Sequence, residues 1–284
     1  MISLEKLLAF IEEDAPFGDI TSETIVEDRD VSAEIVVKDD TVIAGLEEAG
    51  ALFSYFGIIA DPMVRDGSIA DKGSRIMKLR GSARKILLVE RTALNIIGRM
   101  SGIASITRRY ADLIHAVNPK CRVAATRKTA PGLRALDKKA VILGGGDPHR
   151  FNLSDGILIK DNHLALVPQA KAIAACRSAF AFRRIEIEVE SPADALHAAE
   201  AGADIIMMDN MDPAGIQTAI NLLDKSGLRN KVIIEVSGGI DVHSLQGFAR
   251  LDIDLISTGA LTHSVKNTDV SLEILKEEEK HTGR

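Results

Sequence analysis

Near the start of the chain, hydrophobic positions repeat with the period of an α-helix. Four apolar residues between Leu4 and Ile11 follow the i, i+3, i+4, i+7 spacing of one helix face. Ser3 stands where a helix cap is expected, and Pro16 stands where the helix cannot continue. The pattern predicts an amphipathic helix that ends near residue 14.

The segments that follow indicate a small unit of mixed strand and helix. Residues 32–38 alternate apolar with small or polar side chains, which predicts a half-buried strand, and residues 46–55 carry a helical pattern. Glycine–serine pairs divide residues 67–82 into short segments joined by tight turns. We therefore expect a first, α/β domain over residues 1–105.

After residue 105 the pattern changes to short apolar runs separated by stretches of helical length, which is typical of a parallel sheet with crossover helices. Ser191 and Pro192 supply a cap and a first helical residue between two of these runs. The alternation predicts an α/β domain over residues 106–267, and both a barrel and an open doubly wound sheet fit it. The runs cover residues 122–125, 156–160, 185–190, 204–209, 232–237 and 254–257.

Composition and charge narrow the choice of partners. A barrel with a smaller domain fits 284 residues, since a single α/β barrel commonly takes about 250. A net charge of −6 gives no general attraction to nucleic acid or to an anionic membrane, so we expect neither partner. No apolar run approaches the ~18 residues of a membrane span. Cys121 and Cys176 are expected to be reduced thiols in a cytoplasmic protein.

The runs end in polar residues, and in a parallel α/β barrel the reactive side chains lie at the carboxyl ends of the strands. Glu188 and Asp209 close neighbouring runs, where their oxygens could hold Mg²⁺ against a polyphosphate. Glu186 and Glu190 share the parity of Glu188, so the pattern does not choose among the three. Structural ion pairs are the alternative role for these carboxylates.

Glycine-rich segments follow the last two runs. Barrel phosphate sites commonly use such loops, because backbone N–H groups can approach a phosphate where no side chain intervenes. An ordinary turn is the alternative for either loop alone, whereas the two together favour a phosphate site. The candidate residues are Ser237, Gly238, Gly239, Ser257, Thr258 and Gly259.

Basic residues gather locally on an otherwise acidic chain, which indicates a small anionic ligand. A solvated basic face is the alternative, and it is weakest for Lys160, which directly follows an apolar run. An imine-forming lysine of an aldolase is another chemistry that this place allows. His149 and His163 could each be structural histidines. The candidate binding residues of this group are Arg91, Thr126, Arg127, Lys128, Arg134, His149, Arg150 and Lys160.

Several short motifs follow one another in a fixed order along the chain. They are residues 16–21 (PFGDIT), 90–95 (ERTALN), 101–104 (SGIA), 126–134 (TRKTAPGLR), 144–150 (GGGDPHR), 159–163 (IKDNH), 186–190 (EIEVE), 208–210 (MDN), 237–240 (SGGI) and 259–264 (GALTHS). Together they resemble the quinolinate phosphoribosyltransferase family, also called nicotinate-nucleotide pyrophosphorylase (carboxylating). The match spans nearly the whole chain, and the ordered set is far more specific than any single motif.

The resemblance implies a fold and an assembly. The expected fold is an N-terminal α/β sandwich domain followed by an incomplete seven-stranded α/β barrel. A C-terminal helix over residues 268–284 is expected to pack back on the first domain. The resemblance also implies a homodimer, alone or within a higher assembly, whose active sites use both subunits. Arg91 would then reach the barrel of the partner subunit.

The same resemblance implies a reaction. It is Mg²⁺-dependent transfer of a phosphoribosyl group from phosphoribosyl pyrophosphate to quinolinate with loss of CO₂, giving nicotinate mononucleotide for NAD biosynthesis. The basic group around Arg127, His149 and Arg150 would hold quinolinate and nearby phosphates, and the two serine–glycine loops would hold the 5′-phosphate. Glu188 and Asp209 would bind the ribose hydroxyls and Mg²⁺. The expected catalytic residues are Lys128, Lys160, Glu188 and Asp209.

Two positions depart from the family pattern, and two related functions compete with the expected one. Lys139 and Pro148 replace the more usual Tyr and Asn, without removing a residue expected to contact a ligand. One competitor is the related protein of molybdenum-transport loci, whose substrate is uncertain; the intact residues 160–163 argue against it. The other is a catalytically silent carboxylate sensor with the same cationic pocket.

Overall fold

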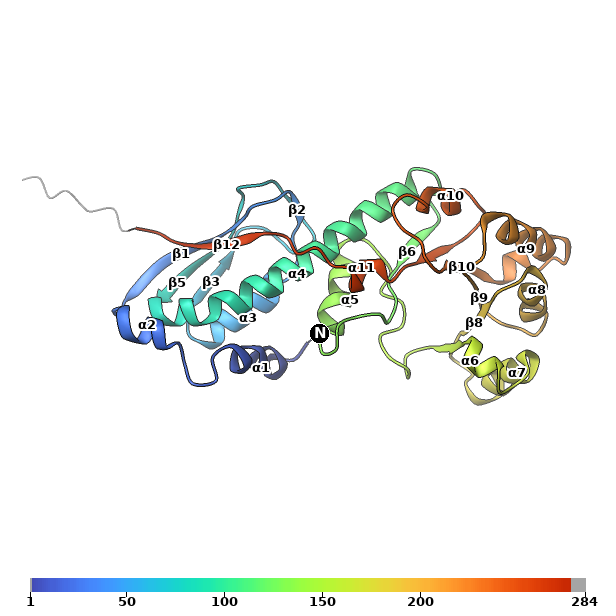
Figure 1. Ribbon diagram of the computed structural model, residues 1–284, viewed down its shortest axis with the longest axis horizontal. Helices are drawn as coiled ribbons and strands as arrows, with labels where there is room; N and C mark the ends of the chain where they lie inside the picture. The colour runs from blue at the N-terminus through green and yellow to red at the C-terminus, as the bar shows by residue number, and fades with distance from the viewer. Residues whose placement is uncertain (1, 277–284) are drawn as a thin grey trace, which may run out of the picture. The chain divides into compact units, whose positions relative to one another are not determined.

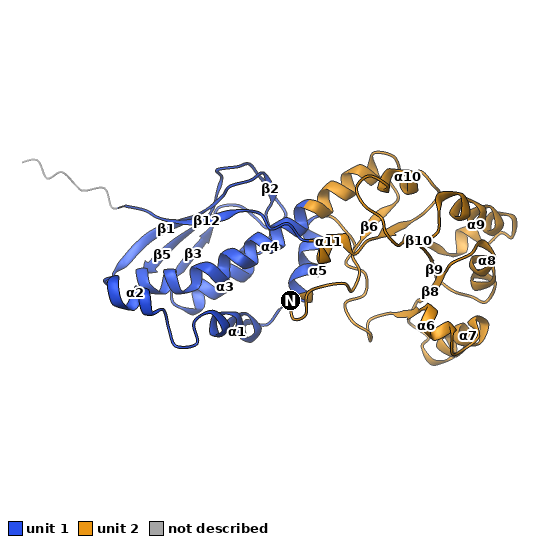
Figure 2. Cartoon of the chain, in the orientation of Figure 1, with its two compact units in different colours: residues 1–105, 135–144, 265–284 blue, residues 106–134, 145–264 orange. Residues whose placement is uncertain are grey.

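The structure is a computed structural model that describes residues 2–276, and the chain divides into two compact units. One unit contains residues 1–105, 135–144 and 265–284, and the other contains residues 106–134 and 145–264 (Figure 2). The first boundary along the chain follows residue 105, where the hydrophobic pattern changes. Residues 135–144 and 265–267, which the pattern assigned to the second domain, group with the first unit instead.

The first unit is built on an antiparallel sheet of four strands in the order β12-β1-β5-β3 (Figure 1). A short antiparallel pair, β2 and β4, lies outside this sheet. The strands are β1 (Asp30–Val37), β2 (Thr41–Val42), β3 (Ile59–Pro62), β4 (Ile69–Ala70), β5 (Arg75–Ser82) and β12 (Val270–Ile274). The helices are α1 (Leu4–Asp14), α2 (Ile20–Ile25), α3 (Leu46–Tyr55), α4 (Ala83–His115) and α5 (Arg134–Leu143), and residues 106–115 of α4 belong to the second unit.

Strand β1 is more deeply buried than its sequence pattern predicts. It pairs with β12 on one side and β5 on the other, so it is a central strand of the sheet. Residues 33–37 are all buried, including Glu34 on the face predicted to be open. The Nε of Arg75 lies 2.9 Å from the Glu34 carboxylate, so the buried acid has an ion-pair partner.

The two helices predicted from apolar periodicity are confirmed. In α1 the Ser3 Oγ accepts a hydrogen bond from the backbone N–H of Lys6, as the sequence predicted for a cap. At the start of α3 the Asp66 carboxylate takes the capping role from a distance in sequence, accepting from the N–H of Leu46 at 3.0 Å. This second cap could not be seen in the local sequence.

Helix α5 is tied to other parts of the first unit by ion pairs. The Lys139 Nζ lies 2.8 Å from a carboxylate oxygen of Glu48 and 2.5 Å from one of Glu47, both on α3. Arg99 of α4 forms a bidentate pair with Asp137, at 2.8 and 2.9 Å. Lys139 therefore has a structural partner at the position where it departs from the family pattern.

The 33-residue helix α4 was not predicted from the sequence. Gly98 and Gly102 interrupt its helical pattern, because glycine weakens a helix by roughly 1 kcal/mol relative to alanine. The helix forms nonetheless since residues such as Ile86, Val89 and Ile97 are fully buried along it. Within the described residues, no helix combines the length and the apolar character needed to cross a membrane.

The expected C-terminal helix over residues 268–284 is wrong for the part that the structure describes. Residues 270–274 form strand β12, which pairs antiparallel with β1 so that Ala33 faces Ile274 (Figure 1). Apolar residues alternate with Ser271 and Glu273 in this segment, which is the period of a strand and not of a helix. Residues 277–284 lie outside the described residues.

The second unit contains a parallel sheet of six strands in the order β6-β11-β10-β9-β8-β7. Each strand coincides with one of the predicted apolar runs. In place of a seventh strand there is a single parallel bridge between Ala124 and Asp147. The strands are β6 (Arg122–Ala124), β7 (Ile157–Ile159), β8 (Ile185–Val189), β9 (Ile205–Asp209), β10 (Ile233–Ser237) and β11 (Leu255–Ser257).

Helices connect successive strands of this sheet. Helix α8 begins at Pro192 with the Ser191 cap that the sequence predicted, and α9 repeats this arrangement with Asp212 and Pro213. These two helices pack against each other beside β8 and β9 (Figure 1). The helices are α6 (Asp161–Leu164), α7 (Gln169–Ala179), α8 (Pro192–Glu200), α9 (Pro213–Lys225), α10 (Leu245–Ala249), α11 (Ala260–His263) and a 3₁₀ turn, η1 (Arg229–Lys231).

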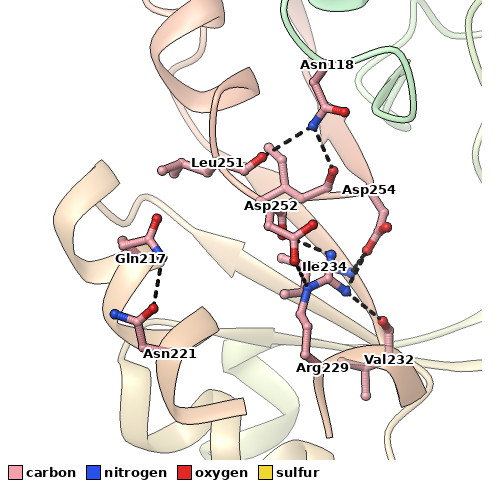
Figure 3. Close-up of polar contacts among 10 residues, drawn as sticks. Asn118, Gln217, Asn221, Arg229, Val232, Ile234, Leu251, Asp252 and Asp254 are labelled. Atoms are coloured by element: carbon pink, nitrogen blue, oxygen red, sulfur yellow. Dashed lines mark hydrogen bonds and ion pairs between the residues drawn. The ribbon is translucent and has the colours of Figure 1, made fainter. Parts of the chain in front are cut away.

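A polar network joins the amino ends of β10 and β11 (Figure 3). The Arg229 side chain is nearly buried, and its Nε lies 2.8 Å from the Asp252 carboxylate while Nη1 lies 3.2 Å from that of Asp254. Asp254 also accepts from the backbone N–H of Ile234 at 2.8 Å. The side-chain amide of Asn118 donates to the chain just before β11. This end of the sheet is therefore stabilised by ion pairs, which leaves the carboxyl ends for chemistry.

Replacement of Gly102 tests the packing of α4. A Cβ at Gly102 would lie 2.2 Å from the carbonyl oxygen of Lys266, which is backbone and cannot move independently. We expect Gly102→Ala to lower the free energy of unfolding by about 2 kcal/mol, despite the better helix propensity of alanine. Gly50→Ala in α3, where the nearest atom is Met77 Cε at 3.8 Å, should be neutral or slightly stabilising. Denaturant titration of both variants measures this; equal stabilities would contradict it.

Candidate functional site

The ends of all six parallel strands surround one cavity of about 780 Å³ in the second unit. This volume lies within the range of roughly 300–1,000 Å³ that is usual for small-molecule sites. Parallel strands carry their carboxyl ends at one edge, so residues far apart in sequence meet there. The lining residues are Ala125, Thr126, Arg127, Lys128, His149, Arg150, Leu158, Lys160, Asp161, Leu164, Gln169, Glu188, Val189, Glu190, Asp194, Met207, Asp209, Glu235, Ser237 and Ser257.

Lys160 and Glu188 meet at the ends of the neighbouring strands β7 and β8. The Lys160 ammonium contacts Oε1 of Glu188. The backbone N–H of Lys160 donates to Nδ1 of His163 at 2.9 Å, which closes the first turn of α6. The His163 ring thus accepts a backbone hydrogen bond, and it is not among the residues that line the cavity.

The guanidinium groups of Arg127 and Arg150 lie close together in the cavity. Burial, and then the charge of Arg127, lower the pKa of Arg150. Arg150 donates to the carbonyl oxygen of Gly156 at 3.2 Å. The Nε of Arg127 is buried and meets no hydrogen-bond acceptor within the described residues. Neighbouring like charges with an unused buried donor are stabilised when an anion binds between them.

The loops after β10 and β11 are fastened to each other. The Thr258 hydroxyl donates to the carbonyl oxygen of Ile240 at 3.0 Å and accepts from the N–H of Ala260 at 3.2 Å. Beside it, the buried Ser257 Oγ has no hydrogen-bond partner in the part of the chain that the structure describes. Ser257 and Ser237 both line the cavity, so an unused hydroxyl is available to a ligand oxygen here.

Glycine at position 238 makes room for the residue beside Asp209. Gly238 has φ +99°, and a Cβ there would lie 2.2 Å from Oδ1 of Asn210. Asn210 itself has φ +52° and donates its side-chain amide to Oδ2 of Asp209 at 2.8 Å. Positive φ is costly for a residue with a side chain, and such strain concentrates at functional sites. The arrangement orients the Asp209 carboxylate at the cavity.

The second glycine loop lies against Lys128. A Cβ at Gly259 would lie 2.9 Å from Cδ of Lys128 and 2.7 Å from Cδ2 of His263. The Lys128 carbonyl oxygen accepts from Oγ1 of Thr262 at 2.9 Å, which holds the backbone of this segment. Only a residue without a side chain at position 259 lets the lysine reach the cavity in this way.

His149 lies between two buried carboxylates. Its Nε2 is 3.3 Å from Oε2 of Glu186 on β8 and 3.3 Å from Oε2 of Glu235 on β10. Burial alone would lower the pKa of His149, but the two adjacent carboxylates overcome this and raise the pKa to about 10. Burial raises the pKa of Glu186 above its usual value. The two carboxylates therefore favour the imidazolium form of His149 at neutral pH.

The backbone fixes where this imidazolium lies. His149 has φ +55°, and its N–H donates to Oδ1 of Asp147 at 2.8 Å. Asp147 is in turn held beside β6 by the bridge to Ala124 and by an ion pair with Arg122 at 3.1 Å. The turn with positive φ at His149 therefore directs its side chain from the segment beside β6 towards the carboxylates on β8 and β10.

The structure brings most residues predicted from the sequence around this one cavity. The glycines at 238, 239 and 259 and Thr258 belong to the adjoining loops without lining it, and Arg91 is an exposed residue of α4 in the first unit. Arg134 donates to the Thr129 hydroxyl at 3.1 Å and also stays outside. The predicted residues in the lining are Thr126, Arg127, Lys128, His149, Arg150, Lys160, Glu188, Asp209, Ser237 and Ser257.

Glu235 was missed in the sequence. It is fully buried on β10, lines the cavity and contacts His149, yet only the residue that ends this strand was considered. A signal was present, because Glu235 is a lone acid inside an apolar run and shares the parity of Ser237. The structure also separates the three glutamates of β8 and its end: Glu186 binds His149, Glu188 contacts Lys160, and Glu190 is exposed.

The fold and the site together are those of an α/β-barrel enzyme with a cavity lined by several cationic side chains. Residues 19–101 match the family model for the N-terminal domain of quinolinate phosphoribosyl transferase, and residues 103–273 match the model for its C-terminal domain. The chain belongs to this family, which makes it a pentosyltransferase.

Known relatives extend the similarity over the whole chain. The probable nicotinate-nucleotide pyrophosphorylases [carboxylating] of Archaeoglobus fulgidus and Methanothermobacter thermautotrophicus are each 44% identical to it. These alignments cover 92% and 93% of this chain and 100% and 96% of the relatives. The nicotinate-nucleotide pyrophosphorylase structure from Francisella tularensis superposes with a TM-score of 0.89 at 33% identity, covering 97% of this chain and 98% of that one.

The charge state of His149 can be measured directly. We expect the His149 ring to remain protonated up to about pH 9, because its pKa is raised to about 10. The associated stabilisation is complete below the unfolded-state pKa near 6.5 and is lost as the pH rises through about 10. NMR titration of ¹⁵N-histidine-labelled protein, with the His149→Asn variant to assign the signal, tests this. A ring that becomes neutral near pH 6.5 would contradict the geometry.

Proposed function

We propose that this protein transfers the phosphoribosyl group of phosphoribosyl pyrophosphate to quinolinate and releases pyrophosphate and CO₂. The product is nicotinate mononucleotide, a step of NAD biosynthesis. Membership of the quinolinate phosphoribosyltransferase family supports this reaction. The observation that carries it in this chain is one cavity whose lining combines Arg127, Arg150 and unused polar donors with the strand-end carboxylates Glu188 and Asp209.

The order of the strands supports the way the two substrates would lie. β11 and β10 are neighbours, so Ser257 and Ser237 bring the two glycine loops together as one candidate 5′-phosphate site. β9 follows next, and its terminal Asp209 would meet the ribose hydroxyls beside that phosphate. β8 and β7 complete the series with Glu188 and Lys160. A bound phosphoribosyl group would extend in this order along the sheet, from its 5′-phosphate at β11 and β10 to its C1 near β8 and β7.

Quinolinate would lie against the basic residues that line the cavity. Arg127 and Arg150 can each form bidentate contacts with a carboxylate, and His149 and Lys160 add two further cations to the same cavity. A dianion such as quinolinate relieves the repulsion between the two guanidinium groups. A ligand with a single carboxylate would leave part of this charge unmatched, so we expect nicotinate to be a poor substrate.

The residues present fit a magnesium ion. Glu188 and Asp209 are carboxylates at the ends of adjacent strands that line one cavity, and Mg²⁺ is usually held by one or two carboxylates together with substrate phosphates. When bound, the ion would offset the charge that develops on the departing pyrophosphate. Lys160, which contacts Glu188, would supply a positive charge next to that position.

The chemistry needs positioning more than a reactive side chain. The ring nitrogen forms a bond to C1 of the ribose as the bond from C1 to pyrophosphate breaks, at a carbon with oxocarbenium character. The cationic ring then releases its 2-carboxylate as CO₂, because the adjacent positive nitrogen stabilises the electron pair left on C2, and that pair takes up a proton. The chain's bases hold the acid against C1, which can supply much of the rate enhancement.

We further propose that the protein acts as a homodimer and that Arg91 completes the site of the partner subunit. Arg91 is exposed on α4 in the first unit, and it does not line the cavity of the second. An exposed arginine within a family motif agrees with a contact that a second copy supplies. Sedimentation of the purified protein measures the assembly.

The reaction is tested with quinolinate, phosphoribosyl pyrophosphate and Mg²⁺, following nicotinate mononucleotide and CO₂ in equal amounts. We expect product from quinolinate, loss of activity with excess chelator and recovery when Mg²⁺ is restored, with nicotinate as the comparison acid. A folded protein that binds quinolinate without forming product would instead be a carboxylate sensor. Full activity in chelator would remove the magnesium proposal alone.

Replacement of the basic residues tests the assignment of the acid site. We expect Arg150→Ala and Lys160→Ala each to lower kcat/KM for quinolinate on the order of 100-fold, since each loses charge-assisted hydrogen bonds worth about 1.5–3 kcal/mol. Lys231→Ala, in the 3₁₀ turn η1 outside the cavity, is the control and should match the wild type. Borohydride should trap no adduct on Lys160. Wild-type kinetics in both variants would refute the assignment.

A further inference from the structure

Two buried carboxylates inside the sheet converge on one nitrogen of His149. Glu235 is fully buried and Glu186 is 4% exposed, and each places an oxygen 3.3 Å from Nε2 of His149. Oε1 of Glu186 and both carboxylate oxygens of Glu235 have no hydrogen-bond partner within the described residues, so the contact of Glu235 with His149 is one of charge. Buried carboxylates in this state are unfavourable unless a positive charge lies beside them.

The chemistry of imidazole links this pair to the cavity. A neutral imidazole that directs its Nε2–H at the carboxylates presents Nδ1 as an acceptor, which would repel a ligand carboxylate. A protonated ring presents a second N–H at Nδ1 and a full positive charge. No hydrogen bond engages Nδ1 of His149 among the described residues, and the side chain lines the cavity. The carboxylates therefore decide whether this edge of the ring attracts or repels an acid.

We propose that Glu186 and Glu235 are positioning residues that keep His149 a cationic double donor, with Nε2–H placed between the two carboxylates and Nδ1–H directed to a carboxylate of the bound acid. The inference rests on the proposed function for the identity of that acid, quinolinate. It assigns a role to Glu235, which no strand-end rule selects, and it makes the binding of the acid independent of pH around neutrality.

The other charged groups near His149 agree with this role. Glu186 approaches from β8 and Glu235 from β10, and these two carboxylates raise the pKa of the ring against the effect of burial. Burial raises the pKa of Glu186, and the positive charges of His149 and Arg150 oppose this rise. Asp147 accepts from the backbone N–H of His149. Lys160 and Glu188 line the same cavity and already contact each other.

The experiment compares quinolinate binding by the wild type, Glu235→Gln and the Glu186→Gln, Glu235→Gln double variant. Isothermal titration calorimetry of the full-length proteins at several pH values between 6 and 8 gives the affinities. We expect the wild type to be nearly constant over this range. In the double variant the pKa of His149 should return towards 6.5, so affinity should fall on the order of tenfold from pH 6 to pH 8. Glu235→Gln should show a smaller fall.

Two controls separate positioning from a purely structural effect. Glu34→Gln removes a carboxylate of similar burial in the first unit and should leave the pH dependence of quinolinate binding unchanged. Glu235→Asp keeps the charge and should restore wild-type behaviour in part. In steady-state assays the variants should raise KM for quinolinate while KM for phosphoribosyl pyrophosphate changes less than about threefold.

The outcomes distinguish this inference from the proposed function. Folded glutamine variants whose quinolinate affinity equals that of the wild type and is flat with pH would overturn the role of the glutamates, even if the wild type turns over quinolinate normally. A wild type that forms no product would overturn the proposed function, whereas pH-dependent binding confined to the glutamine variants would still support the role of the glutamates. Histidine NMR of the double variant gives the ring's charge independently and must show titration near pH 6.5.

Discussion

Parallel hydrogen bonding of six strands is the constraint on which the site depends. It places the carboxyl ends of β6, β11, β10, β9, β8 and β7 at one edge, so Arg127, Ser257, Ser237, Asp209, Glu188 and Lys160 surround a single cavity although they are spread over 131 positions of the chain. The opposite ends are occupied by structural ion pairs such as that of Arg229 with Asp252 and Asp254. The amino ends of the strands thus carry structural ion pairs, and their carboxyl ends carry the residues of the candidate site.

The charge inside the cavity differs from the net charge of the chain. The chain carries a net charge of −6, yet Arg127, Arg150, Lys160 and His149, whose pKa is raised to about 10, all line this one cavity. Each cation is either balanced by a specific carboxylate or left for a ligand. Lys160 contacts Glu188 and His149 lies between Glu186 and Glu235, whereas the buried Nε of Arg127 is unused within the described residues. The positive charge and the unused donor of Arg127 favour the binding of an anion in the cavity.

Backbone strain is concentrated at the same place. Among the described residues, His149 and Asn210 are the non-glycine residues with positive φ, and both serve cavity side chains. His149 is delivered to its carboxylates by the strained turn, and Asn210 holds Asp209. Gly238 is required beside Asn210 because a Cβ would overlap its side chain. Such strain persists only where surrounding contacts hold it, which here are those of the sheet itself.

The sequence by itself determined the elements, because apolar period and end signals are local: the runs that became the six parallel strands, helices α1 and α3, and the Ser191 cap were all predictable. Order along the chain also indicated the family. The tertiary structure alone decided which side chains meet. The partnership of Glu235 with His149 joins residues 86 positions apart, the helical length of α4 depends on burial, and β12 depends on the open edge of β1. Contacts of this kind are set by packing between distant segments, and no local pattern encodes them.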